Sequence, residues 1–132
     1  EQLNSTPVSQ LKREAKEWLE IVEAHYGVKP IIYTNVDFYN RYLGEDFDEY
    51  PLWVAHYYQP VQPRIRRGWV LWQHSDRGRV NGIVSPVDFN VFNGDSAEFR
   101  QLLIRLTGYP ADLNCSNLSV QFNTWNRAGT IM

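Results

Sequence analysis

LWQHSD (residues 71–76) and PVDFNVF (residues 86–92) are two short apolar segments with polar side chains set among the apolar ones. Each has the length and the aromatic or β-branched content of a strand buried in a sheet. A buried strand seldom contains an amide such as Gln73 or a carboxylate such as Asp88, unless local hydrogen bonds satisfy the group or it faces a site. Strands that end in carboxylates, amides and indoles are typical of sugar-processing clefts, so both segments are candidates for the lining of such a cleft.

The chain on either side of these segments predicts alternating helices and strands. Hydrophobic spacing and turn residues predict, in order, a helix over 7–26, a strand over 30–34, a short helix capped by Asn35 and reaching Tyr42, strands over 52–56, 69–74 and 87–92, and a helix from an Asp95-Ser96 cap through Leu106. The first helix is expected to begin with a hydroxyl cap from Ser5-Thr6 and with Pro7 at its first position. Residues 76–82, rich in Gly and Asn, are expected to form a turn. This order favours a parallel α/β sheet that finishes in antiparallel strands or hairpins.

Composition narrows the class of protein. The 132 residues suit one globular domain or a piece of a larger one. The formal net charge of −2, without a block of Lys and Arg, argues against nucleic acid as a partner. No apolar run approaches the roughly 18 residues of a membrane span. The single cysteine, Cys115, excludes an internal disulfide and a multi-cysteine metal site.

Two loops gather charge. Residues 45–49 form an acidic stretch, and Arg64, Arg66 and Arg67 form the only basic cluster. Solvated loops are the expectation for both. The functional alternatives are a cation site at the acidic loop, which lacks EF-hand spacing, and a clamp for an anionic ligand at the basic one.

Aromatic residues are abundant, with 5 Trp, 8 Tyr and 6 Phe. Several cluster in residues 53–58 and 69–72, close to the expected strand ends. Packing in the core explains any single ring. The functional alternative is a set of flat apolar faces for pyranose rings, for which Trp and Tyr are suited because each also carries a hydrogen-bond donor.

Four segments together resemble family-25 glycoside hydrolases, which are lysozymes. They are PIIYTN (30–35), PLWVAHY (51–57), WQHS (72–75) with Gly78 and Gly82-Ile83, and VDFNVF (87–92), in the family's order. The resemblance runs from about Thr6 to Leu106 and is closest to the branch found in gut-type Gram-negative bacteria. It implies an α/β fold, an irregular TIM-like (β/α) barrel whose site lies at the strand C-terminal ends.

The chain is short for such a barrel, which needs roughly 200 residues or more. We therefore expect residues 1–108 to be the C-terminal half of the catalytic barrel and residues 109–132 to be an extension of uncertain structure. The chain begins a few residues before a helix, so we expect an upstream part of the same protein.

The resemblance implies hydrolysis of the β-1,4 bond between N-acetylmuramic acid and N-acetylglucosamine in peptidoglycan, with retention of configuration and without a cofactor or metal. It also implies a secreted, periplasmic or cell-envelope location. The expected partners are peptidoglycan glycan strands, together with the N-terminal half of the barrel or a second copy of the chain. An inactive cell-wall carbohydrate-binding module is the alternative function, and this chain alone is expected to be inactive.

The family's catalytic pair is an Asp-x-Glu placed just before the helix that begins here near Pro7. No Asp-x-Glu precedes that helix in this chain, but Glu1 lies at about the distance where the family's general acid falls. Glu1 is therefore a candidate catalytic acid, and an exposed Glu just past the motif is the alternative. Asp88 matches an acidic residue on the family's last strands, where it would tune the acid or orient a water; a structural Asp is the competing interpretation.

The resemblance also assigns substrate-binding residues. Tyr33 matches a tyrosine of the cleft, Trp53 a stacking aromatic at a strand end, and Gln73 a site-facing amide that bonds sugar hydroxyls. Trp72 alternates with Gln73 and is expected in the core. His56 and His74 lack a third ligand at metal spacing, so we expect hydrogen-bonded structural histidines and no metal site.

Overall fold

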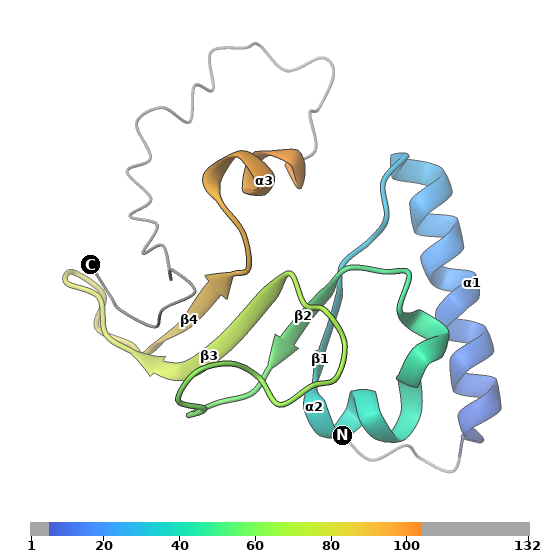
Figure 1. Cartoon of the computed structure of the whole chain (residues 1–132), viewed down its shortest axis with the longest axis horizontal. Helices are drawn as coiled ribbons and strands as arrows, with labels where there is room; N and C mark the ends of the chain where they lie inside the picture. The colour runs from blue at the N-terminus through green and yellow to red at the C-terminus, as the bar shows by residue number, and fades with distance from the viewer. Residues whose placement is uncertain (1–5, 104–132) are drawn as a thin grey trace. The chain divides into compact units, whose positions relative to one another are not determined.

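The computed structural model describes residues 6–103 and divides the chain into two compact units, Glu1–Asn93 and Gly94–Met132. The first unit contains one sheet, whose strands β1 (Ile32–Asn35), β2 (Leu52–Ala55), β3 (Leu71–Gly78) and β4 (Val87–Phe92) lie side by side in that order (Figure 1). The first three strands are parallel, and β4 is antiparallel to β3. The predicted parallel sheet with an antiparallel end is confirmed.

The described residues form an open sheet with β1 and β4 at its edges, and not the closed barrel that the resemblance implies. Four strands are too few to close on themselves, because a TIM barrel needs eight. The part of the fold that is shown is therefore a mixed α/β arrangement around four strands.

Helix α1 (Val8–Tyr26) forms where the spacing of apolar residues predicts it. Leu11, Ala15 and Leu19 recur at steps of four and lie on its inner side. Gly27 ends the helix with φ 69°, a left-handed conformation that glycine adopts without a steric penalty. The predicted start is wrong in one detail, because Pro7 occupies the N-cap position itself and gives no side-chain cap; Ser5 of the predicted hydroxyl cap lies outside the described residues.

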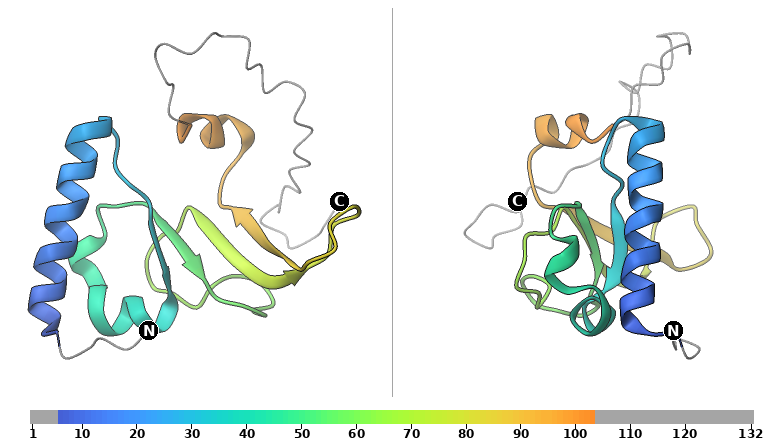
Figure 2. Two further views of the ribbon diagram at one scale, coloured as in Figure 1. Left: turned by 180° about the vertical axis from the view of Figure 1, so that it is seen from behind. Right: turned by 90° about the vertical axis from the view of Figure 1, so that its right-hand side faces the viewer.

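A compact helical segment follows β1 and lies beside α1 (Figures 1 and 2). It consists of α2 (Val36–Phe38), the π-helical turn η1 (Tyr39–Leu43) and the 3₁₀ turn η2 (Gly44–Phe47). Asn35 begins it as predicted, because its side-chain Oδ1 accepts a hydrogen bond from the Phe38 N–H at 2.8 Å.

The core lies on one face of the sheet. Strand alternation directs Leu52, Val54 and Trp72 to that face, where they are buried. The helical elements supply the other buried side chains, namely Leu19, Tyr39, Leu43, Phe47 and Tyr50. The prediction that Trp72 belongs to the core is confirmed, and its indole N–H donates to the His56 carbonyl at 2.9 Å.

Strand β3 extends further than predicted, into residues expected to form a turn. It continues to Gly78 and pairs with β4 through two register shifts, one on each side of Ser75. The two backbones approach closely at Gly78, where a Cβ atom would lie 2.6 Å from Phe89 Cε1 and 2.7 Å from the Val87 carbonyl oxygen. Only glycine fits this crossing without a shift of its neighbours.

Arg67 is not the solvated side chain that its basic loop predicts. Its guanidinium donates to the carbonyl oxygens of Phe47 at 3.0 Å, Asp48 at 3.2 Å and Tyr50 at 2.5 Å. It also donates to the Tyr39 hydroxyl at 3.3 Å and pairs with the Asp48 carboxylate. The side chain is only 12% exposed. Arg67 therefore joins its own loop, between β2 and β3, to the loop of residues 47–50.

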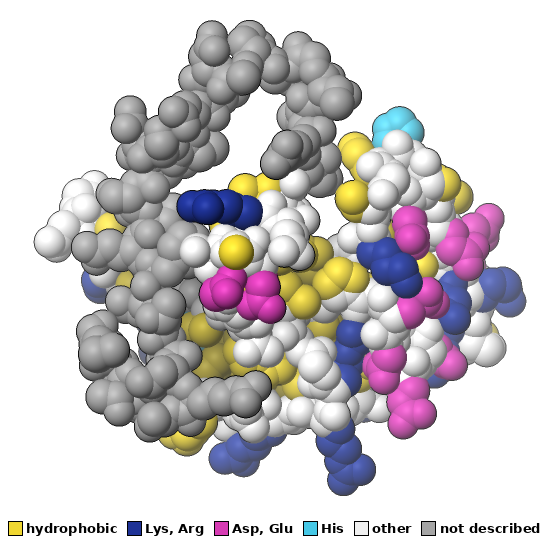
Figure 3. All heavy atoms as spheres, turned by 45° about the horizontal axis from the view of Figure 1, so that its top comes forward, with side chains coloured by type: hydrophobic (Ala, Val, Ile, Leu, Met, Phe, Trp, Pro, Cys, Tyr) yellow, Lys and Arg dark blue, Asp and Glu magenta, His cyan; other side chains and the backbone are white. Residues whose placement is uncertain are grey.

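The acidic loop is solvated, as predicted, because Glu45, Asp46, Asp48 and Glu49 are all exposed, and two of these carboxylates form surface ion pairs. Lys12 of α1 pairs with Asp46 at 2.6 Å, and Lys29 pairs with Glu49 at 3.0 Å. Figure 3 shows Lys or Arg and Asp or Glu side chains interspersed over α1 and its surroundings. Among the described residues, no helix has the length and apolar content needed to cross a membrane.

The second unit is described over residues 94–103 and contains α3 (Ser96–Gln101). Asp95 caps it as predicted: its carboxylate accepts from Ala97 N–H at 2.8 Å and Glu98 N–H at 2.9 Å. Glu98 accepts in return from the Asp95 N–H at 2.8 Å, which completes a capping box. The predicted end at Leu106 lies outside the described residues.

Candidate functional site

The face of the sheet opposite the core carries the polar and aromatic residues singled out from the sequence. Tyr33 of β1 lies opposite Trp53 of β2, and Gln73 of β3 lies opposite Asn90 of β4. Alternation along each strand points these side chains away from the core face. Tyr33, Trp53 and Gln73 are thus brought together, whereas Glu1 lies outside the described residues.

Gln73 lies at the centre of this group and is 4% exposed. Its Oε1 accepts hydrogen bonds from the hydroxyls of Tyr33 at 2.5 Å and Tyr57 at 3.2 Å. Both tyrosine protons are therefore committed to the amide, and the lone pairs of both hydroxyl oxygens remain available as acceptors. A buried amide in a core strand is thus explained by a local network beside a surface.

Trp53 is held by two contacts on the same face. Its ring packs edge-to-face against Tyr33, with centroids 5.0 Å apart and an interplanar angle of 66°. Its indole N–H donates to Asn90 Oδ1 at 2.8 Å. The ring orientation is therefore fixed before any ligand arrives, and the ring of Tyr33 beside it is 54% exposed.

Asp88 is exposed, which corrects the sequence-based view of it as a buried carboxylate. It lies on the edge strand β4, two residues before Asn90 and so on the same face as that residue. Burial is the main cause that raises the pKa of the Tyr57 hydroxyl, with smaller contributions from Tyr33, Asp76 and Asp88. The charge of Asp88 is the smallest of these contributions, and its predicted role in catalysis stays a prediction.

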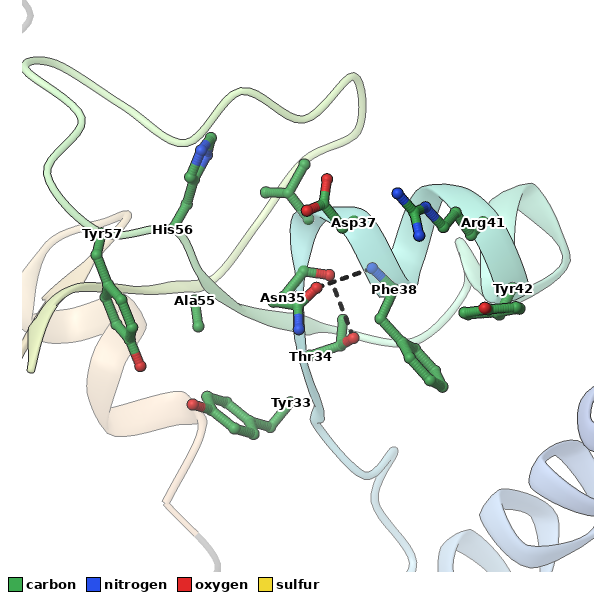
Figure 4. A pocket seen from close by; sticks show the side chains of 11 residues that line it. Tyr33, Thr34, Asn35, Asp37, Phe38, Arg41, Tyr42, Ala55, His56 and Tyr57 are labelled. Atoms are coloured by element: carbon green, nitrogen blue, oxygen red, sulfur yellow. Dashed lines mark hydrogen bonds between the residues drawn. The ribbon is translucent and has the colours of Figure 1, made fainter. Parts of the chain in front are cut away.

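An open cavity of about 720 Å³ lies at the C-terminal ends of β1 and β2 (Figure 4). It is lined by Tyr33, Thr34, Asn35, Val36, Asp37, Phe38, Arg41, Tyr42, Ala55, His56 and Tyr57. Sites in parallel α/β folds form at this end of the strands, because the loops that follow them converge there. Of the residues assigned from the sequence, Tyr33 lines the cavity, whereas Trp53, Gln73 and Asp88 stand outside its lining.

The cavity has two chemically different walls. Tyr33 and Tyr57, linked through Gln73, present hydroxyl oxygens. Asp37, Arg41 and His56 form the other wall, with the Asp37 carboxylate between the other two side chains in Figure 4. The sequence reasoning missed Tyr57, Asp37 and Arg41 as site residues; their positions just after two parallel strands are the signal that points to them.

His56 is hydrogen-bonded, as predicted, but it also faces the cavity. Its Nδ1 accepts from the Arg64 N–H at 3.1 Å. Burial, with a smaller effect of the Arg64 charge, lowers the pKa of the imidazole, so the ring is neutral at pH 7. Because Nδ1 is an acceptor, the neutral ring carries its proton on Nε2.

His74 is held by aromatic contacts. It packs between the rings of Trp72 and Phe89, with centroid distances of 5.5 Å and 6.1 Å, and the hydrogen bond predicted for its ring is not found within residues 6–103. Burial lowers its pKa. Within residues 6–103, no group of three or more His, Cys, Asp or Glu side chains is arranged to hold a metal ion.

The loop after β2 contains a strained residue. Tyr58 has φ 58°, a left-handed conformation that costs a residue with a Cβ roughly 1–3 kcal/mol. Two hydrogen bonds hold it there, from its N–H to the His74 carbonyl at 3.1 Å and from its hydroxyl to Asp76 Oδ1 at 2.8 Å. They fix the direction of the chain next to Tyr57, and so help to place that hydroxyl at the cavity.

Known proteins are similar to this chain in sequence and in fold. Residues 1–83 match the family model described as glycosyl hydrolases family 25. The uncharacterized protein YegX from Escherichia coli (strain K12) is 47% identical over 100 residues, which are 76% of this chain and 37% of YegX. Lysozyme M1 from Streptomyces globisporus is 32% identical over 98 residues, which cover 67% of this chain and 33% of that enzyme.

A solved structure agrees with these sequence matches. The structure of a family 25 glycosyl hydrolase from Bacillus anthracis superposes with a TM-score of 0.65 at 27% identity, over 74% of this chain and 46% of that one. The chain thus spans between a third and a half of the length of the relatives it matches. The match to the family over residues 1–83, and the identity to YegX over three quarters of the chain, place this chain in family 25 of the glycosyl hydrolases.

Proposed function

We propose that this chain forms the sugar-binding part of a peptidoglycan hydrolase of the lysozyme type. The reaction is cleavage of the β-1,4 bond between N-acetylmuramic acid and N-acetylglucosamine, with retention of configuration, in an irregular TIM-like barrel. The observation that carries the proposal is the Tyr33–Gln73–Tyr57 network beside an open cavity at the strand C-terminal ends, with Trp53 on the same face. Peptidoglycan lies outside the cytoplasm, so the proposed location is the cell envelope or the secreted fraction.

The network suits an acetamido sugar. The Tyr33 and Tyr57 protons are directed to Gln73, so their oxygens accept hydrogen bonds from an acetamide N–H or from sugar hydroxyls. Gln73 Nε2 forms no hydrogen bond within residues 6–103 and is a donor for a sugar oxygen. Ordering these groups before binding lowers the entropic cost of association.

Catalysis needs a general acid that protonates the glycosidic oxygen. Glu1 is the proposed acid, and Asp88 is the proposed supporting carboxylate on the sheet face that carries Gln73 and Asn90. In substrate-assisted retaining glycosidases the acetamide of the sugar itself attacks the anomeric carbon, so positioning the acetamide is part of the chemistry. Tyr33 and Tyr57 are the proposed positioning groups.

The first test compares Asp88→Asn with Glu17→Gln in the complete protein that contains this chain. Asp88→Asn is expected to lower the release of reducing ends from purified peptidoglycan by about a hundredfold, because the carboxylate supports the acid. Its melting temperature should stay within ~2 °C of wild type, because Asp88 is exposed. Glu17, exposed on α1, is the control.

Wild-type turnover in Asp88→Asn would contradict the role proposed for this residue. The 132-residue chain alone is expected not to solubilise peptidoglycan, because a single carboxylate, Asp37, lines the described cavity, whereas the chemistry needs a positioned general acid. Binding of glycan without release of reducing ends by the complete protein would favour the alternative function, an inactive carbohydrate-binding module.

A further inference from the structure

We propose that Arg41, together with His56, binds a carboxylate on a substituent attached to one sugar of the glycan. The charged wall of the cavity then selects the sugar that carries this substituent. The inference rests on the proposed function, since it assigns part of the substrate to the second wall of the same cavity. The carboxylate has two alternative sources. One is the lactyl group of a muramic sugar that carries no peptide, and the other, where a peptide is joined to the lactyl group by an amide bond, is a carboxylate of that peptide. Both present the same planar anion.

Arg41 is a cation available to a ligand. It is exposed, lines the cavity and follows Asp37 by one helical turn. No carboxylate of residues 6–103 lies within 4.0 Å of its guanidinium nitrogens, although Lys12, Lys29 and Arg67 each have such a partner. A guanidinium presents parallel N–H donors that match the two oxygens of a carboxylate.

His56 supplies a second donor from another element. Its Nδ1 is occupied by the Arg64 N–H, which leaves Nε2–H as the donor of the neutral ring. Arg41 comes from η1 and His56 directly follows β2, and in Figure 4 the two side chains lie on opposite sides of Asp37 in the same wall of the cavity. A carboxylate that accepts from both groups, beside the Asp37 carboxylate, would receive hydrogen bonds from two elements of the fold.

The two walls of the cavity would then bind different parts of one molecule. The hydroxyl oxygens of Tyr33 and Tyr57 suit the uncharged N–H and O–H groups of the sugar, whereas Arg41 and His56 suit an anion attached to it. The cavity volume of about 720 Å³ is within the range of small-molecule sites, roughly 300–1,000 Å³. An unsubstituted amino sugar would fill only the hydroxyl wall.

Substitution of Asp37 is expected to change the affinity for the anion in the opposite direction to substitution of Arg41. Its carboxylate lines the same wall and would repel a bound anion. Asp37→Asn should therefore strengthen the binding of the charged saccharide, while Arg41→Gln weakens it. A purely structural role for the two residues would move both affinities in the same direction.

The experiment measures binding to the complete protein that contains this chain, by isothermal titration at pH 7 and low salt. The probes are N-acetylglucosamine, N-acetylmuramic acid, the methyl ester of N-acetylmuramic acid, and N-acetylmuramyl dipeptide. Arg41→Gln is expected to weaken binding of at least one carboxylate probe about tenfold and to leave N-acetylglucosamine within about twofold. Arg66→Gln, an exposed arginine outside the cavity lining, is the matched control and should change nothing.

The four probes distinguish a lactyl carboxylate from a peptide carboxylate. They also distinguish failure of this inference from failure of the proposed function. Loss of the preference for the free acid over its methyl ester in Arg41→Gln identifies the lactyl carboxylate, and an effect confined to the dipeptide identifies the peptide; both support the proposal. Equal weakening of all four probes, or no change in any, overturns it. If Tyr33→Phe still weakens N-acetylglucosamine while Arg41→Gln changes nothing, the inference alone fails. If no saccharide binds the wild-type complete protein, the proposed sugar site fails as well.

Discussion

Gly78→Ala tests the close approach of β3 and β4. The added Cβ would lie 2.6 Å from Phe89 Cε1, 2.7 Å from Phe89 Cδ1 and 2.7 Å from the Val87 carbonyl oxygen. The Phe89 ring can rotate away, but the Val87 oxygen belongs to the backbone of the paired strand. The strands must therefore separate by several tenths of an ångström, and overpacking of this kind costs about 1–3 kcal/mol.

The expected change is large enough for thermal unfolding followed by circular dichroism. A loss of about 2 kcal/mol lowers the melting temperature of a domain of this size by roughly 8–16 °C. Gly68→Ala is the matched control, because a Cβ at Gly68 meets no atom within 4 Å and its φ is not in the left-handed region. That variant should be neutral or slightly stabilised, by up to about 1 kcal/mol, through the unfolded state.

A second variant separates the two contacts. In a Phe89→Ala background the ring contact is gone and the Val87 oxygen remains, so Gly78→Ala should cost less there than in wild type, but more than zero. Equal melting temperatures for Gly78→Ala and Gly68→Ala would refute the reasoning, because the strands would then have no close crossing at this point.

Two further changes test the helix cap and a buried imidazole. Asn35→Ala removes the side-chain acceptor of the Phe38 N–H and should lower the free energy of unfolding, measured by chemical denaturation, by about 1 kcal/mol. Asn40→Ala, at an exposed position of the same segment, should lower it by less than half of that. Equal losses would contradict the capping role. Burial holds the pKa of His74 below its ordinary 6.5, so the unfolded chain binds more protons in acid, and stability is complete above about pH 6.5 and falls as the pH drops below it. His74→Phe should therefore show a smaller fall in melting temperature between pH 7 and pH 5 than wild type, and an unchanged fall would place the acid sensitivity elsewhere.

Local rules were sufficient for much of the fold. The Asn35 cap, the Asp95 cap and the burial of Trp72 follow from side-chain chemistry and from alternation along one strand. The parallel sheet with a final antiparallel pair follows from the succession of helices and strands. These features depend on residues close together in the chain, which is why the sequence alone predicts them.

Features that join distant segments could not be predicted in this way. Arg67 looks like one of three arginines in an exposed loop, and only the folded chain places the carbonyl oxygens of Phe47 and Tyr50 around it. Gly78 looks like a turn glycine until β4 is placed against it. In the same way, the resemblance suggested Tyr33 and Gln73 separately. Only the structure shows that the hydroxyls of Tyr33 and Tyr57 both donate to the amide oxygen of Gln73.

The contacts of Arg67 have a consequence for which substitutions the neighbouring loop can accept. Three of its acceptors, in Phe47, Asp48 and Tyr50, are main-chain oxygens, which every amino acid possesses. An exposed position in that loop, such as Glu49, can therefore be replaced without removing any of these three bonds. Arg67 thus holds three main-chain oxygens of the loop whatever residues occupy its exposed positions, and a designer who wished to vary the loop surface would need to keep Arg67.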